Sequence, residues 1–255
     1  MRAPDWRHTV LLAATMLLAA CATSGLRDER TGIQVTPKRE VRTTADERAR
    51  REASIALHQA GRALADNDLP LALRHARKAV AVDPASADPL LALGVLLERA
   101  GQLAEAGETY RKALLLAPGN ADAANNYGAW LCAQGHEAEA LVIFDRAITA
   151  GASAWHSGLL ANAGTCALRA GQPVRAERDL RVALQLEPEN AQALQEMARL
   201  QLQRGELMSA RAFYQRRLAA APATVSVLQI ALEVEQGLGD SKAVEQYRQL
   251  LQQNP

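Results

Sequence analysis

Three cysteines, Cys21, Cys132 and Cys166, carry the most reactive side chains of this 255-residue sequence. A thiol can be acylated, can form a disulfide or can bind zinc, and its surroundings decide between these fates. A zinc site needs four ligands, and no pair of histidines lies close to Cys132 and Cys166 in the sequence. The sequence also lacks a His-Glu-x-x-His motif, a phosphate-binding glycine loop and a nucleophile elbow. We therefore expect no metal site, no cofactor and no enzymatic activity.

Cys21 ends an N-terminal segment that is typical of a secretory signal peptide. Arg2 and Arg7 precede an apolar run over residues 10–20, which is too short for a membrane-spanning helix of about 20 residues. The run ends in Leu-Ala-Ala-Cys, which resembles a bacterial lipoprotein signal. This resemblance implies that residues 1–20 are removed and that Cys21 is lipidated. Because alanine and not aspartate follows the cysteine, it favours an outer-membrane anchor with the protein facing the periplasm.

The charge and composition of the chain restrict its partners and its fold. Without residues 1–20 the chain has 27 basic and 27 acidic residues, because Arg2, Arg7 and Asp5 leave with the signal. A nucleic-acid-binding protein needs a surplus of positive charge to displace counterions from phosphates, so we expect no nucleic acid as a partner. Aromatic residues make up 4% and apolar residues 49% of the sequence, with much alanine and leucine, which predicts an all-α fold.

Prolines mark an internal repeat of about 34 residues. They stand at positions 84, 118, 188, 222 and 255, with intervals of 34, 70, 34 and 33 residues, and Ala152 occupies the missing place. This period is typical of tetratricopeptide repeats (TPR), each of which is a helix–turn–helix unit. We predict a right-handed superhelical solenoid of about six repeats, which span residues 53–86, 87–120, 121–154, 157–190, 191–223 and 224–255.

Small residues recur at the places where the two helices of a repeat must approach each other, as at Gly94 in the repeat over 87–120. The first and last repeats match the pattern less well, as expected for units that have only one neighbour. Residues 21–52 show no repeat, and we predict a lipidated N-terminus followed by a flexible tether. Within this segment residues 32–36 favour a strand locally, and they are either plain linker or a segment that docks on a partner.

Cys132 and Cys166 fall at places twelve and ten of the first helices of neighbouring repeats. First helices of a TPR stack run side by side, and the two places differ by about 3 Å along the helix axis. Outside the cytoplasm such cysteines tend to be bridged, so one interpretation is a disulfide between the third and fourth repeats. The other interpretation is two buried, unpaired thiols.

The inner face of a TPR stack is lined by first helices and holds peptides or helices. Amide and basic side chains occupy the places that usually point to this face in the third to fifth repeats: Asn125, Asn126, Asn162, Arg169, Gln195 and Arg199. Amides suit an extended peptide backbone, since each offers a donor and an acceptor. The alternative is that Asn126 and Asn162 only bind neighbouring helices within the stack.

The second repeat presents apolar residues at the same places, namely Leu91, Ala92 and Val95. The predicted groove is therefore polar at one end and apolar at the other. Such a surface suits an amphipathic helix or strand of a partner protein.

Two segments of the predicted solenoid carry a family resemblance. Residues 125–132 read Asn-Asn-Tyr-Gly-Ala-Trp-Leu-Cys, and residues 162–166 read Asn-Ala-Gly-Thr-Cys. Both resemble segments of the type IV pilus biogenesis and stability lipoproteins of the PilW/PilF family, in which a lipoprotein signal and a short tether precede six TPR units. The resemblance covers about residues 10–255 and brings Trp130 into the set of partner-binding candidates. The first repeat departs from it, because it has few large residues at its key places.

The resemblance implies a pilotin, a lipoprotein that binds the secretin subunit of the pilus system and promotes its outer-membrane localisation and multimerisation. Its expected partners are the secretin subunit and, through the lipid on Cys21, the membrane, with no small-molecule substrate. The alternative function is a periplasmic TPR adaptor that scaffolds cell-envelope machinery for peptidoglycan synthesis or barrel assembly.

Overall fold

The computed structural model describes residues 26–27, 34–35, 44–151 and 156–253, which belong to two compact units, Met1–Thr44 and Ala45–Pro255. In the first unit, β1 (Leu26–Arg27) pairs with β2 (Gln34–Val35) in an antiparallel ladder that sets Leu26 opposite Val35. The strand β2 lies within the segment whose sequence favours a strand. Cys21 lies outside the described residues.

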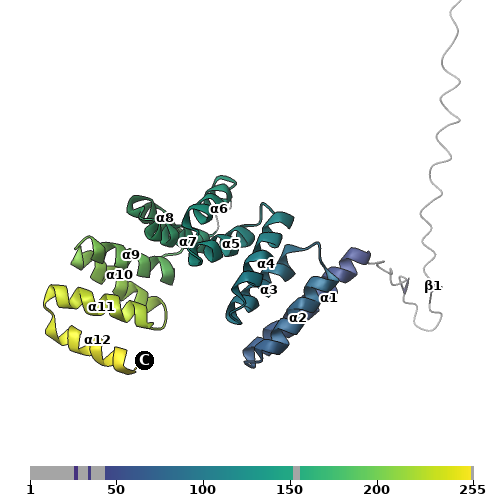
Figure 1. The fold of residues 1–255 in the computed structure, drawn as a ribbon. Helices are drawn as coiled ribbons and strands as arrows, with labels where there is room; N and C mark the ends of the chain where they lie inside the picture. The colour runs from purple at the N-terminus through teal and green to yellow at the C-terminus, as the bar shows by residue number, and fades with distance from the viewer. Residues whose placement is uncertain (1–25, 28–33, 36–43, 152–155, 254–255) are drawn as a thin grey trace, which may run out of the picture. The chain divides into compact units, whose positions relative to one another are not determined.

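The described part of the second unit consists of helices that follow one another in chain order (Figure 1). Their bounds are α1 Ala45–Ala65, α2 Leu69–Val82, α3 Ala87–Arg99, α4 Leu103–Leu116, α5 Ala121–Ala133, α6 Glu137–Thr149, α7 Ser157–Arg169, α8 Pro173–Leu186, α9 Ala191–Gln203, α10 Leu207–Ala220, α11 Val225–Leu238 and α12 Ser241–Gln253. Each odd-numbered helix packs against the even-numbered helix that follows it and against the next odd-numbered helix. These six helix pairs form the predicted TPR fold.

The turn inside each helix pair contains a residue with positive φ. In five pairs a glycine with positive φ ends the first helix, at positions 101, 135, 171, 205 and 239. At the first of these turns the Gly101 amide donates to the Glu98 carbonyl (2.9 Å) and the Gln102 amide donates to the Leu97 carbonyl (2.9 Å). Asn67, with φ of 59°, takes this role between α1 and α2. Left-handed residues satisfy helix-end carbonyls at little steric cost when they are glycine or asparagine.

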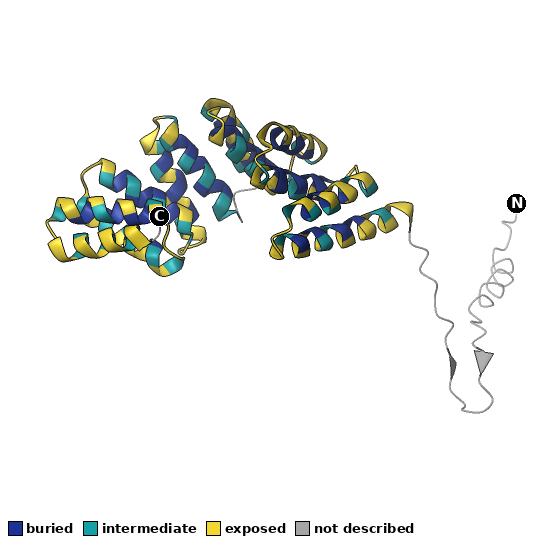
Figure 2. Cartoon of the chain, turned by 60° about the horizontal axis from the view of Figure 1, so that its bottom comes forward, coloured by how far each residue is buried: buried dark blue, intermediate teal, exposed yellow. Residues whose placement is uncertain are grey.

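Glycines at place eight allow the two helices of a pair to touch. A Cβ atom on Gly94 would lie 2.3 Å from Cε1 of Tyr110, and one on Gly128 would lie 2.7 Å from Cε1 of Phe144. Both rings are fully buried, so each ring fills the space that the glycine leaves. Figure 2 shows the result as buried stripes where helices face one another and exposed stripes on their outer sides.

The repeat unit begins earlier than the sequence pattern predicts. Helix α1 starts at Ala45, inside the segment 21–52 that we expect to be a tether. Its first turn carries Asp46 and Glu47, whose negative charges are favourable at a helix N-terminus. The apolar pattern starts only at Ala53, the first buried residue of α1, so the sequence pattern does not reveal the charged first turns of this helix.

None of the described helices has the length and hydropathy that a membrane span requires.

Candidate peptide-binding face

Four first helices, α5, α7, α9 and α11, lie side by side and carry polar residues at corresponding places. These residues form hydrogen bonds from one helix to the next. We call this set the polar ladder, and its members are Asn125, Asn126, Asn162, Thr165, Gln192, Gln195, Glu196, Arg199 and Ser226.

The first half of the polar ladder joins α5, α7 and α9. The Asn162 amide donates to Oδ1 of Asn125 (2.8 Å), and Nε2 of Gln192 donates to Oδ1 of Asn162 (2.7 Å). Gln192 also donates to Oγ1 of Thr165 (3.0 Å), while Nδ2 of Asn125 donates to Oδ1 of Asn126 (3.5 Å). Every amide in this row therefore contacts a neighbour, which fixes the orientation of the row.

The second half of the polar ladder joins α9 to α11 and carries charge. Nε of Arg199 donates to Oε2 of Glu196 (3.1 Å), and Nη2 of Arg199 donates to Oγ of Ser226 (3.0 Å). Nε2 of Gln195 lies 3.4 Å from both Oε1 of Glu196 and Oγ of Ser226. The Glu196 side chain is mostly buried (11% exposed), whereas that of Arg199 is 41% exposed, so the guanidinium is held in place and still reaches solvent.

The polar ladder keeps hydrogen-bonding capacity for a ligand. An amide side chain has two N–H donors and an oxygen with two lone pairs. Among the described residues, Nδ2 of Asn126 has no acceptor, and Asn162 uses one of its two N–H groups. Both residues are half-buried, so these free groups lie on a surface that a peptide backbone could reach. The arrangement can bind a chain by donating to its carbonyls and accepting from its amides.

The asparagines are expected either to bind a partner or to bind neighbouring helices within the stack, and the contacts divide them between these two roles. Asn125 and Asn162 hydrogen-bond to each other across α5 and α7, which makes them part of the stack. Asn126 only accepts a long hydrogen bond from its neighbour and is the freer candidate. Arg169 lies one turn beyond Thr165 on α7, and its Nε is 3.5 Å from Oε1 of Glu137 on α6.

Trp130 differs from the expectation that it contacts a partner. Its Nε1 donates to the Leu103 carbonyl (3.0 Å), and its ring is stacked on Tyr127 with centroids 6.1 Å apart. The ring also covers Gly107, where a Cβ atom would lie 2.3 Å from Cζ2 of the indole. Trp130 therefore packs α5 against α4, and its polar atom is already used within the stack.

Cys132 and Cys166 form a disulfide between α5 and α7, with their Cα atoms 5.8 Å apart. Both residues are buried. The bridge and the hydrogen bond from Asn162 to Asn125 connect the same two helices. Between these helices the chain passes through α6 and the segment 152–155, which lies outside the described residues. The spacing of the polar ladder at this junction is thus fixed by a covalent bond as well as by hydrogen bonds.

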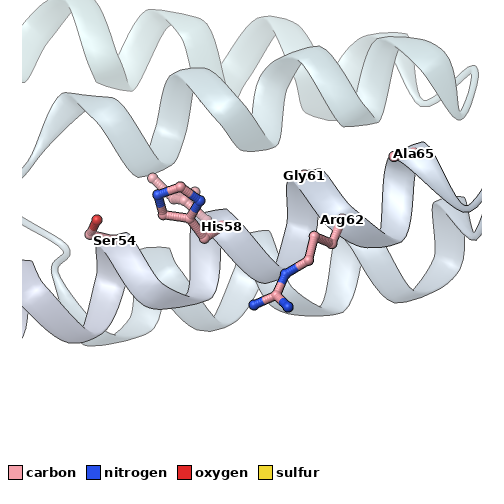
Figure 3. A pocket seen from close by; sticks show the side chains of 6 residues that line it. Ser54, His58, Gly61, Arg62 and Ala65 are labelled. Atoms are coloured by element: carbon pink, nitrogen blue, oxygen red, sulfur yellow. The ribbon is translucent and has the colours of Figure 1, made fainter.

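The first helices of the first two repeats present a more apolar face. On α1 a cavity of about 470 Å³ is lined by Ser54, Leu57, His58, Gly61, Arg62 and Ala65 (Figure 3). On α3 Leu91 and Ala92 are half-buried, and Val95 is 39% exposed. The change from apolar to polar side chains along the stack follows the predicted groove.

One member of the polar ladder, Ser226, does not stand out in the sequence. The repeat boundary at residue 224 puts Ser226 at place three, which does not usually point to the inner face. Helix α11 begins one residue later, at Val225, so Ser226 is its second residue, as Gln192 is the second residue of α9. A threonine cap could have shown this shift, because the Thr224 side chain accepts from the Val227 amide.

Within the described ranges no group of three or more His, Cys, Asp or Glu residues could hold a metal ion. The one carboxylate of the polar ladder, Glu196, faces the guanidinium of Arg199. The face is therefore a neutral hydrogen-bonding surface.

Comparison with known proteins agrees with this fold. A family model described as "Tetratricopeptide repeat" matches residues 167–232. The type IV pilus assembly protein PilF of Pseudomonas aeruginosa is 33% identical over 141 residues, which are 54% of this chain and 55% of PilF. The matched region thus spans about half the length of that relative.

Two solved structures are similar over most of their length. The crystal structure of PilW, a widely conserved type IV pilus biogenesis factor, matches with a TM-score of 0.70 and 25% identity, covering 79% of this chain and 93% of PilW. The structure of Pseudomonas aeruginosa PilF matches with a TM-score of 0.69 and 25% identity, covering 80% of this chain and 92% of that chain. A TPR protein from Parabacteroides merdae, at 18% identity and a TM-score of 0.60, shares the fold.

Proposed function

We propose, from the premise that this chain is a tetratricopeptide repeat protein homologous to PilF and similar in structure to PilW, that it serves type IV pilus biogenesis as a pilotin. In this role it binds the secretin subunit, brings it to the outer membrane and promotes its assembly into multimers. Its contribution is affinity and placement, and no covalent bond is made or broken.

The observation that carries this proposal is the polar ladder, which joins four consecutive first helices by side-chain hydrogen bonds. A disulfide and an ion pair hold this row in place before any ligand arrives. A preorganised face loses little conformational entropy on binding, so more of the interaction free energy appears as affinity. Binding is also what TPR stacks generally offer, through an extended surface built from first helices.

We assign different parts of a secretin segment to the two ends of the face. The apolar residues on α3, Leu91 and Val95, would contact aliphatic or aromatic side chains of the segment. Asn126 and Gln192 would hydrogen-bond its main chain, and Arg199 would pair with an acidic side chain at the α9 end. An amphipathic segment, with apolar side chains at one end and polar ones at the other, fits this division in chemistry.

The membrane address is proposed from the sequence. Cys21 would carry the lipid, and the tether that follows would let the repeat unit reach subunits some distance from the anchor. A Cys21→Ser variant should remain in the periplasm and leave secretin subunits misplaced, whereas correctly placed multimers in that variant would contradict the lipid address.

Deletion of the gene tests the pilotin function. Heat- and detergent-resistant secretin multimers should disappear from membranes while secretin monomer is still present, and the wild-type gene should restore them. Unchanged multimers in the deletion strain would contradict the proposal and leave an envelope adaptor as the function to pursue by crosslinking.

The binding face is tested by Asn126→Ala combined with Gln192→Ala in the full chain. We expect weaker capture of the purified secretin subunit, with a loss of stability limited to about 1 kcal/mol, because Gln192→Ala also removes the hydrogen bonds to Asn162 and Thr165. Gln215→Ala is a matched control, because Gln215 is an exposed amide on α10 away from the polar ladder. Equal capture by all three proteins would rule out the polar ladder as the binding surface.

A further inference from the structure

A second candidate surface lies on the outer side of the second and third repeats. A cavity of about 370 Å³ opens between α4, α5 and α6 and is lined mainly by Leu114, Leu115, Tyr127, Glu139, Ile143 and Arg146. Leu115 of this lining is 66% exposed, and Leu116 and Val142, each next in sequence to a lining residue, are 48% and 47% exposed. Exposed aliphatic residues that border an apolar cavity are typical of a binding surface.

The hydroxyl group of Tyr127 in this cavity has no partner. The other two buried tyrosines donate to carboxylates, Tyr110 to Glu98 (2.6 Å) and Tyr214 to Glu235. Tyr127 is 9% exposed, yet no hydrogen bond to its hydroxyl occurs among the residues that the structure describes. Burial raises its pKa, as does the charge of Glu139, so the neutral hydroxyl is kept as a donor. Among the described residues this hydroxyl is not one of the fully buried polar atoms that lack a partner, so it is open to the cavity and available to a ligand.

The rim of the cavity carries unpaired charges of both signs. The side chains of Glu139 and Arg146 form no ion pair or hydrogen bond with any described residue, in contrast to Asp145, which binds Arg175 on α8. A third charged residue of the lining, Arg111, pairs with Glu108 (2.7 Å), which leaves one carboxylate and one guanidinium without a partner. Such a rim does not select a simple anion or cation. It favours a partner surface that presents one positive and one negative side chain at a matching distance.

The face of α6 itself has this complementary pattern. Glu139 and Arg146 are seven residues apart, about 10.5 Å along the helix axis, and Val142 and Ile143 lie midway between them. When two copies of α6 are placed antiparallel about a twofold axis between positions 142 and 143, each Glu139 faces the Arg146 of the other copy. The two apolar pairs then meet at the axis.

We propose that a second copy of this chain binds here, forming a twofold symmetric dimer through α6 and the neighbouring end of α4. In such an isologous interface each contact occurs twice, so one complementary pattern yields two ion pairs. Val142 and Ile143 of the two copies meet at the axis, and Leu115 and Leu116 extend the apolar contact. This surface is separate from the polar ladder, so the dimer leaves both peptide-binding faces free.

Thiol crosslinking of the full chain in membranes tests the position of the twofold axis. Val142→Cys should yield a dimer band with a short thiol-to-thiol crosslinker, because the two introduced thiols lie near the axis. Val174→Cys is the control, since Val174 is 78% exposed on α8 and away from the interface. The wild-type chain reports any crosslinking through Cys21. A dimer band no stronger for Val142→Cys than for Val174→Cys would overturn the proposal.

Charge reversal tests the pairing itself. In sedimentation velocity of the purified full chain in detergent, Glu139→Arg and Arg146→Glu should each weaken dimerisation by about tenfold or more, since each creates two like-charge contacts. The double variant should recover the dimer, because the pairs are restored with exchanged signs. A wild-type chain that stays monomeric up to its solubility limit, or a double variant as weak as the single ones, would refute the interface.

Discussion

Asn162 on α7 donates a hydrogen bond of 2.8 Å to Asn125 on α5, and the same two helices are bridged by the disulfide between Cys132 and Cys166. The two links lie on one pair of helices, and the chain that connects these helices includes α6 and the segment 152–155. A covalent and a polar link thus act on the same junction. The registry between the third and fourth repeats, and with it the spacing of the polar ladder, depends on both.

Loss of the Asn162 amide should destabilise the stack modestly. Asn162→Ala removes the donor to Asn125 and the acceptor for Gln192, but the site is half-buried, so water can replace part of what is lost. We expect a decrease of about 1 kcal/mol in the free energy of unfolding, measured by urea denaturation. Asn126→Ala should change it by less, because Asn126 accepts only a 3.5 Å hydrogen bond. Equal losses for both variants would contradict the assignment of Asn162 to the stack.

Removal of the disulfide should cost more. Cys132 and Cys166 are 34 residues apart, and closing a loop of this size stabilises a folded protein by about 3.7 kcal/mol through the entropy of the unfolded chain. The double variant Cys132→Ser with Cys166→Ser should lose about that amount in urea denaturation. Reductant should lower the stability of the wild type and leave the double variant unchanged. A wild type that is insensitive to reductant under denaturing conditions would show that the thiols are not bridged.

The repeats could be predicted from the sequence because their signals are local and periodic. Gly94 under Tyr110 and Gly128 under Phe144 follow from one rule, a small residue at the place where a large side chain of the second helix must fit. The turn glycines follow from another, because only a few residue types accept positive φ.

The candidate site was harder to predict, because its chemistry depends on neighbours that are about 30 residues away. Whether Asn162 faces a ligand or another helix is decided by Asn125 and Gln192, which the pattern of its own repeat does not reveal. Trp130 became a candidate only through the family resemblance, and its contacts with the carbonyl of Leu103 and the bare backbone of Gly107 show that the half-buried ring packs against α4. A single-residue shift of α11 placed Ser226 on the polar ladder.

Acid should destabilise the last two helix pairs through Glu235. This carboxylate is buried (1% exposed) and binds Arg211 and the Tyr214 hydroxyl. Burial alone would raise the pKa of Glu235, but the hydrogen bonds from Arg211 and Tyr214 outweigh it and lower the pKa below its usual value. A lowered folded-state pKa means that the contribution to stability is present above the unfolded-state value of about 4.3 and is lost as the pH falls through the folded-state value.

The variant Glu235→Gln checks this contribution. It leaves Arg211 with only the more exposed Asp240 as a counter-charge (3.4 Å), so we expect a loss of about 3 kcal/mol at neutral pH and a weaker dependence of stability on pH below about 4.3. Glu245→Gln is the control, because Glu245 is an exposed carboxylate on α12 that pairs with Arg248. The idea fails if the two variants show the same acid dependence as the wild type.

A pair of glycine substitutions distinguishes close packing from helix propensity. A Cβ atom on Gly94 would lie 2.3 Å from Cε1 of the fully buried Tyr110, so Gly94→Ala should force the ring to move and destabilise the protein by about 1–3 kcal/mol. Gly61 lies within α1 with no atom within 4 Å of an added Cβ, so Gly61→Ala should stabilise the protein by about 0.5–1 kcal/mol. Urea denaturation of both variants measures the two effects with one method. Opposite signs are required, because the same substitution gains helix propensity at both positions and meets a neighbouring ring at only one.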